Sequence, residues 1–151
     1  MKTIYAMPGH LIRRAHQIST AIFAEECAEF DLTSIQYAAL SAIHTYTDLD
    51  ATRLSRVIAF DRTTIGGVLE RMEAKGWIRR EPTPTDKRVK LLRLTPTGEK
   101  LLEDIAPAVD RVQQRLVEPL AQGDREVFLR LLGTLTDAHN EITSAPLQSI
   151  D

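Results

Sequence analysis

Near both ends of the chain, apolar residues recur at intervals of three and four, a spacing that predicts helices with one apolar face. In the N-terminal part, Leu11, Ala15, Ile18 and Ile22 follow this pattern, so we expect a long helix over residues 9–30. The same spacing returns in the last third of the chain and predicts two further helices there.

The first of these two C-terminal helices has a clear start. Thr95 can cap it, and Pro96 then occupies the first helical position, where a missing backbone N–H group is tolerated. Pro107 lies inside this helix and should bend it. Gly123 marks a break before the last helix.

The middle of the chain contains signals for three shorter helices. Thr33 and Gln36 form the pattern of a capping box at the start of the first helix. Asp50 and Asp61 can cap the second and the third, and Gly76 is placed to end the third in a left-handed conformation. The second and third helices are separated by about three residues, which is the spacing of a helix-turn-helix.

After Gly76 the pattern changes to that of β-strands. We expect short strands over residues 77–81 and 89–95, joined by a turn that is rich in proline and charge. The turn contains the basic pair Lys87 and Arg88. A β-hairpin with a basic tip that follows a helix-turn-helix is a wing.

The predicted fold is therefore mainly α-helical with one small β-hairpin, in a single domain over residues 1–151. Residues 33–95 would form a winged helix-turn-helix, and residues 8–30 and 96–143 would form dimerisation helices. These terminal helices have more apolar surface than one small winged module can cover, so we expect a homodimer. The alternative is a monomeric six-helix domain.

The net charge of −2 is unevenly distributed along the chain. The segment from Arg53 to Arg93 contains 11 lysines and arginines and 5 acidic residues, whereas the remainder contains 8 basic and 16 acidic residues. A basic block between acidic segments is typical of a site for a polyanion. A solvated charged surface is the alternative interpretation.

We expect residues 53–95 to contact double-stranded DNA. The helix after Asp61 would be the recognition helix, because an arginine and two threonines at its start can bind phosphates or base edges. The wing arginine would enter the minor groove, held in place by an aspartate two residues earlier. The predicted DNA-binding residues are Arg53, Arg62, Thr63, Thr64, Gly66, Gly67, Arg71, Asp86, Lys87 and Arg88.

Gly66 and Gly67 are unusual inside a helix, where two glycines cost roughly 2 kcal/mol relative to two alanines. They would let the helix backbone approach DNA closely. The alternative is a surface that simply tolerates them.

Two segments resemble the MarR family of bacterial transcriptional regulators. They are residues 61–80, which include DRTT and LERMEAKGWIRR, and residues 86–98, DKRVKLLRLTPTG. The most specific features are Asp86, Arg88 and the pattern L-x-L-T-x-x-G that follows them. Gly66 and Gly67 depart from the family, in which larger polar side chains often stand there.

The resemblance implies a dimer that binds a pseudo-palindromic operator, usually as a repressor. In this family a small, often aromatic or phenolic acid typically relieves binding from a pocket between the dimerisation helices and the winged module. Arginine can hold a carboxylate through two hydrogen bonds, and an aromatic side chain can contact the ring of such an effector. The predicted ligand-binding residues are His10, Arg13, Arg14, His16, Tyr37 and His44. Alternatively, Arg13 and Arg14 are solvated or pair with acids across the dimer.

Two other hypotheses remain open. Cys27 could make the protein a redox-responsive regulator, although the neighbouring Glu25, Glu26 and Glu29 should raise the pKa of its thiol. A helical protein–protein adaptor is also conceivable, but it would leave the basic block without a purpose.

The chain has no recognisable catalytic or metal-binding motif, so we expect no enzymatic activity, no cofactor and no metal site. No long apolar segment and no signal-peptide pattern is present, and we therefore expect a cytoplasmic protein that does not contact a membrane.

Overall fold

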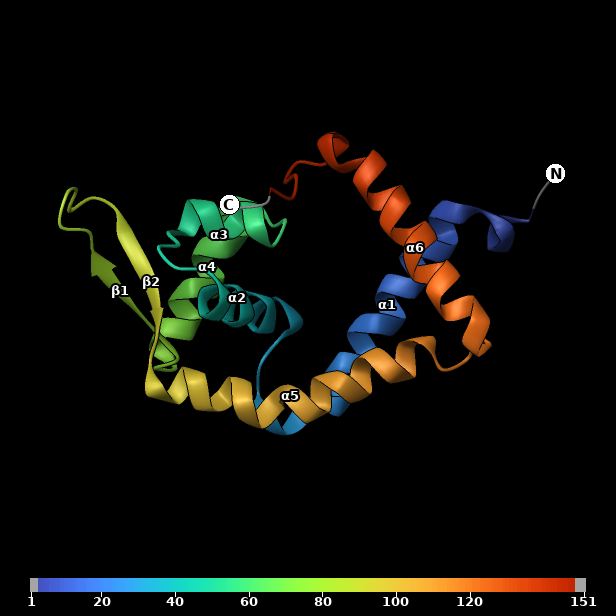
Figure 1. The fold of residues 1–151 in the computed structure, drawn as a ribbon, viewed down its shortest axis with the longest axis horizontal. Helices are drawn as coiled ribbons and strands as arrows, with labels where there is room; N and C mark the ends of the chain where they lie inside the picture. The colour runs from blue at the N-terminus through green and yellow to red at the C-terminus, as the bar shows by residue number, and fades with distance from the viewer. Residues whose placement is uncertain (1–2, 149–151) are drawn as a thin grey trace.

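A computed structural model describes residues 3–148, which form a mostly helical structure with one β-hairpin (Figure 1). The ends of the predicted single domain, residues 1–2 and 149–151, lie outside the described part. The elements in chain order are η1 (Ile4–Ala6), α1 (Pro8–Glu26), η2 (Ala28–Phe30), α2 (Ser34–Thr45), α3 (Ala51–Val57), α4 (Arg62–Ala74), β1 (Ile78–Pro82), β2 (Lys90–Leu94), α5 (Pro96–Val117), α6 (Gln122–Ala138) and η3 (Asn140–Ile142). The predicted fold class is confirmed.

The helix starts follow the predicted caps. Thr33 and Gln36 form the reciprocal hydrogen bonds of a capping box at the start of α2. The side chains of Asp50, Asp61 and Thr95 each accept a hydrogen bond from a backbone N–H group in the first turn of α3, α4 and α5. Local side-chain chemistry therefore sets where these helices begin.

The first helix is shorter than predicted. It ends at Glu26 rather than at residue 30, and a single 3-10 turn, η2, follows it. Asp31 then adopts a left-handed conformation with φ of 48°. This change of direction starts the connection to α2 and lets α1 leave the winged module, as Figure 1 shows.

β1 is shifted by one residue from the predicted range, and β2 is one residue shorter at each end than predicted. The end of α4 explains the start of β1. The N–H group of Trp77 donates to the carbonyl of Met72, and that of Gly76 donates to the carbonyl of Glu73. With Gly76 at φ of 73°, these bonds form a Schellman motif. The N–H group of Trp77 is therefore used by the helix, and the strand begins at Ile78.

The hydrophobic core lies inside the winged module and continues along α5. Its fully buried side chains include Leu40, Leu54, Ile65, Leu69 and Ile105. The start of α5 packs against α2 and β2, and α5 also packs against α1. Figure 1 shows α5 running from the wing side of the molecule toward α6, so this one helix connects the winged module to the terminal helices.

The terminal helices keep most of their apolar surface exposed. No residue of α6 is buried, although Leu129, Leu131 and Leu135 are large and apolar. Leu11 and Ile18 of α1 are exposed as well. Within residues 3–148, no helix has the length and apolar character needed to cross a membrane.

A cluster of charged residues fastens α1 to α5. The Glu26 carboxylate accepts hydrogen bonds from Nε of Arg111 (2.8 Å) and from Nη1 of Arg115 (2.6 Å). Nη2 of Arg115 also donates to Glu25 (3.0 Å). The hydrogen bonds from Arg111 and Arg115 lower the pKa of Glu26 below its ordinary value.

This cluster predicts a pH-dependent stability. A lowered pKa in the folded protein means that Glu26 stabilises it above the pKa of the unfolded chain, and that this contribution is lost as the pH falls through the folded value. Glu26→Gln should therefore lower the melting temperature at pH 7, and the difference from wild type should shrink toward pH 3. Thermal unfolding between pH 3 and pH 7 measures this. Glu29→Gln is the control, and a deficit for Glu26→Gln that stays constant with pH would contradict the assignment.

Candidate nucleic-acid interface

The recognition helix α4 has one buried and one open side. Ile65, Val68, Leu69 and Met72 are buried in the core. Arg62, at the start of the helix, is exposed. The fold of the helix-turn-helix therefore turns the predicted contact residues outward.

Thr63 and Thr64 differ in what they can offer to DNA. The hydroxyl of Thr64 donates to Oδ2 of Asp61 (2.5 Å), and its N–H group donates to Oδ1 (2.8 Å). These hydrogen bonds lower the pKa of Asp61. The Thr64 hydroxyl proton is thus used in the helix cap, whereas Thr63 is exposed and its hydroxyl makes no hydrogen bond within the described residues. Of the two, Thr63 is the better placed donor to a phosphate.

The fold does not require glycine at positions 66 and 67. A Cβ atom at Gly66 would have Nη1 of Arg62 as its nearest neighbour at 3.9 Å, and one at Gly67 would have Nη1 of Arg71 at 3.5 Å. Both are ordinary contacts with the ends of flexible side chains. The two arginines therefore lie next to a stretch of bare helix backbone on the outer side of α4.

The wing tip is shaped by Asp86 through the backbone. Its Oδ1 accepts a hydrogen bond from the N–H group of Arg88 (2.9 Å), and its own backbone groups bond to the Thr83 hydroxyl. Asp86 was expected to hold the wing arginine, and its side chain bonds to the main chain of Arg88. The side chains of Lys87 and Arg88 are exposed and make no ion pair within the described residues.

The basic block divides into two sets of residues. Four of its 11 cations form ion pairs: Lys75 with Asp31, Arg79 with Glu81, Arg80 with Glu73, and Arg93 with Asp48 and Glu81. The other seven form no ion pair within residues 3–148, and they are Arg53, Arg56, Arg62, Arg71, Lys87, Arg88 and Lys90. All five predicted DNA-binding cations belong to this unpaired set. The positive charge available to a polyanion is therefore concentrated on α3, α4 and the wing tip.

Two basic residues near the predicted site, Arg80 and Lys90, were not among the predicted contacts. Arg62, Arg88 and Arg80 line a hollow of about 230 Å³ between the start of α4 and the wing. Arg80 lies opposite Leu92 in the hairpin, whereas its neighbour Arg79 lies opposite Arg93. The alternation along a strand places Arg79 and Arg80 on opposite faces, and this signal could have identified Arg80.

The predicted ligand-binding residues are not gathered at one place within this chain. Arg13, Arg14 and His16 are exposed on the N-terminal half of α1, and His10 packs edge-on against the ring of Tyr5 (5.6 Å between centroids). Tyr37 packs beside Phe23, near the other end of α1 (6.1 Å between centroids).

The spacing along α1 explains this separation. Arg14 and Phe23 are nine residues apart, which is roughly 14 Å along a helix. His44 is exposed at the end of α2.

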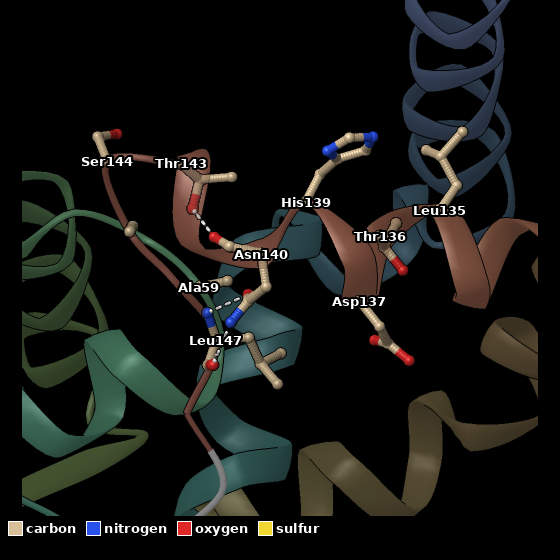
Figure 2. A pocket seen from close by; sticks show the side chains of 10 residues that line it. Ala59, Leu135, Thr136, Asp137, His139, Asn140, Thr143, Ser144 and Leu147 are labelled. Atoms are coloured by element: carbon tan, nitrogen blue, oxygen red, sulfur yellow. Dashed lines mark hydrogen bonds between the residues drawn. The ribbon is translucent and has the colours of Figure 1, made fainter.

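A cavity of about 620 Å³ lies elsewhere, between the end of α6, the C-terminal segment and Ala59 (Figure 2). Figure 2 shows the Asn140 side chain turned toward Leu147, with which it forms two hydrogen bonds (3.0 and 2.9 Å). The N–H group of Gln148 donates to the carbonyl of Arg56 at the helix-turn-helix. None of the six predicted ligand-binding residues lines this cavity.

Cys27 is buried, with 1% of its surface exposed. Burial raises the pKa of its thiol, and the charge of Glu26 raises it further. Because the thiolate is the reactive form, these effects suppress oxidation. The redox alternative is therefore disfavoured.

Comparison with known proteins agrees with this architecture. A model described as the MarR family matches residues 30–89. The HTH-type transcriptional repressor NicR of Pseudomonas putida is 33% identical over 130 residues, which cover 86% of this chain and 82% of NicR.

Solved structures are also similar. The structure of Bordetella bronchiseptica BpsR, whose DNA binding is regulated by 6-hydroxynicotinic acid, superposes with a TM-score of 0.85 at 29% identity, over 91% of this chain and 98% of BpsR. A mutant MarR from E. coli complexed with operator DNA superposes with a TM-score of 0.79 at 27% identity, over 84% of this chain and 91% of that one. The chain belongs to the MarR family of transcriptional regulators.

Proposed function

We propose that this protein is a cytoplasmic transcriptional repressor that binds operator DNA as a homodimer and is released by a small aromatic or heteroaromatic acid. The observation that carries the proposal is the concentration of unpaired cations on α3, α4 and the wing tip. In a winged helix these parts reach the major groove and an adjacent minor groove. Repression and release are binding equilibria, so the proposal involves no enzymatic step, cofactor or metal.

The predicted DNA contacts fall into three groups under this proposal. Arg62, Thr63 and Arg71 on α4 would contact base edges or phosphates, and Gly66 with Gly67 would let the helix backbone approach the DNA. Arg88 would enter the minor groove, with Asp86 shaping the wing tip and Lys87 adding charge there. Arg53 would bind the phosphate backbone. The hydrogen bonds from Thr64 to the capping Asp61 would fix the start of α4.

The proposed dimer follows from the uncovered apolar side chains of α1 and α6. Residues 8–30 and 96–143 would form the dimer interface, and residues 33–95 would form the DNA-binding part of the same single domain. A second copy of the chain would cover these side chains with the same helices, because most oligomers of identical chains are symmetric. Two recognition helices could then reach half-sites of a pseudo-palindrome about 10 base pairs apart.

The proposed effector is an aromatic or heteroaromatic acid. The support comes from the exposed Arg13 and Arg14 on α1 and from BpsR, whose DNA binding responds to 6-hydroxynicotinic acid. His10, His16, Tyr37 and His44 would complete the pocket. Within one chain, the candidates on the N-terminal half of α1 lie far from Tyr37 on α2. We therefore propose that the partner's terminal helices close the pocket when the dimer forms.

Release then requires the acid to prefer a dimer whose recognition helices are wrongly spaced for the operator. A hundredfold loss of DNA affinity needs about 2.7 kcal/mol of differential ligand binding between the two states.

DNA binding is tested at Arg88. An operator is first selected from a random duplex library with the wild-type protein. Arg88→Ala should then lower affinity by roughly 1–3 kcal/mol and weaken the preference for A·T-rich flanks, because this arginine would read minor-groove shape. Fluorescence anisotropy at physiological salt measures both. Lys100→Ala, on the exposed start of α5, should bind like wild type. Wild-type affinity in Arg88→Ala would rule out the docking.

The dimer is tested on α6. Leu131→Glu places a charge on the exposed apolar face and should raise the dimer dissociation constant by at least about a hundredfold, since burying an unpaired carboxylate is costly. Gln122→Glu adds the same charge to the same helix, outside this face, and should leave the dimer intact. Sedimentation equilibrium distinguishes the two. A monomeric wild type, or an undisturbed dimer in Leu131→Glu, would contradict the assembly.

The effector site is tested by calorimetry with 6-hydroxynicotinic acid and other aromatic acids found by thermal-shift screening. Arg14→Ala or Arg13→Ala should weaken binding of the best acid by about tenfold or more, because a carboxylate would lose a charge-assisted hydrogen bond. Operator DNA should weaken binding of the acid by the factor by which the acid weakens DNA binding. Unchanged affinity in both variants would remove these arginines from the pocket, and equal affinity with and without operator would remove the mechanism.

A further inference from the structure

The hollow between α4 and the wing gathers three guanidinium groups from three elements. Arg62 comes from the start of α4, Arg80 from β1 and Arg88 from the wing tip. Lys90 lines it as well, and so does Asp50, whose carboxylate accepts the capping hydrogen bond from Arg53 N–H (2.8 Å). The hollow therefore presents a strong excess of positive charge.

Arg80 lines this hollow and forms an ion pair with α4. Its place opposite Leu92 puts it on the face of the hairpin that packs toward the helices. Nε of Arg80 lies 3.1 Å from Oε2 of Glu73 on α4, and 32% of its side chain is exposed. A guanidinium has five N–H donors, so one carboxylate contact at Nε leaves donors available for a second anion.

The path that DNA would take across a winged helix indicates which anion this hollow could hold. With α4 in the major groove and Arg88 in the adjacent minor groove, the strand that separates the two grooves must pass between them. The hollow lies at that position, between the start of α4 and the wing. In this docking Arg80, which comes from the hairpin and pairs with α4, would face this strand rather than the base edges at the groove floor.

We propose that the hollow holds a backbone phosphate of this strand and that Arg80 is a phosphate-binding residue of the interface. The proposal rests on the proposed DNA-binding function and adds a contact to it. Arginine suits the role because its planar fork can bind two phosphate oxygens together. Glu73 is the positioning residue, because its carboxylate on α4 pairs with Nε of Arg80 and so fixes where the guanidinium group lies.

The chain offers a matched control one residue away. Arg79 is also an arginine on β1, but it lies on the opposite face and its Nε donates to Glu81 (2.7 Å). Truncation of either arginine removes one charge and one ion pair from the same strand. Only Arg80 lines the hollow.

The test compares Arg80→Ala and Arg79→Ala on the selected operator and on an unrelated duplex over a range of salt concentrations. Arg80→Ala should weaken binding to both duplexes by the same factor, about tenfold, and should reduce the slope of log K against log salt by about 1. Arg79→Ala should stay within about twofold of wild type with an unchanged slope. Arg80→Lys should restore the slope, because a cation is present again.

Three results would overturn the assignment of Arg80. One is wild-type binding by Arg80→Ala. Another is a loss confined to the selected operator, which would mean base reading. The third is a loss with an unchanged salt slope that Glu73→Ala reproduces, which would mean that only the ion pair matters. Failure of the wild-type protein to bind either duplex would instead contradict the proposed function.

Discussion

The carbonyl oxygen of Trp77 lies where the recognition helix, the wing and α5 meet. It accepts a hydrogen bond from the N–H group of Thr95 (3.0 Å), which joins the two ends of the wing hairpin. The Thr95 hydroxyl donates to the carbonyl of Gly76 (2.5 Å) and accepts from the N–H group of Gly98 (3.1 Å), so one side chain closes α4 and opens α5. A Cβ atom at position 98 would collide with the Trp77 carbonyl. This junction therefore requires Thr95 and Gly98, the threonine and the glycine of the pattern L-T-x-x-G.

The junction matters for the proposed function because it directly links the parts that would contact DNA to the helix that leads to the proposed dimer interface. Hydrogen bonds join the wing, the end of α4 and the start of α5, and the side chains of Ile105 and Leu92 are buried in the same core. Under the proposed function, a change at the terminal helices would reach the winged module through α5. The spacing of two such modules in a dimer is what an effector would have to alter.

The local chemistry of the sequence was enough to predict most of the fold. Caps at Thr33, Asp50, Asp61 and Thr95 depend on residues close in sequence, and so does the left-handed Gly76. The break of α1 after Glu26 was missed because it depends on packing: Cys27 is buried there and Glu26 is held by two arginines from α5.

The same distinction applies to the site. The exposed positions of Arg62 and Arg88 could be predicted from their places in a helix start and a wing tip. The pairing of Arg93 with Asp48 could not, because these residues are 45 positions apart and meet only in the folded chain. The predicted effector residues illustrate the limit most clearly, since a list of suitable side chains on α1 and α2 carries no information about their separation in space. Only the folded chain reveals that Tyr37 lies beside Phe23, far from Arg14.

Gly66 and Gly67 constrain how α4 can select a sequence. Neither glycine is needed for packing, since a methyl group at either position would meet only the end of an arginine side chain. Two alanines would stabilise the helix by roughly 2 kcal/mol, so the fold carries a cost at this place. Glycine also offers no side chain to a base edge. Under the proposed function, sequence reading by α4 would therefore come from Arg62, Thr63 and Arg71. The guanidinium groups of the two arginines lie next to the bare backbone, and the glycines would set how closely that backbone can approach the groove.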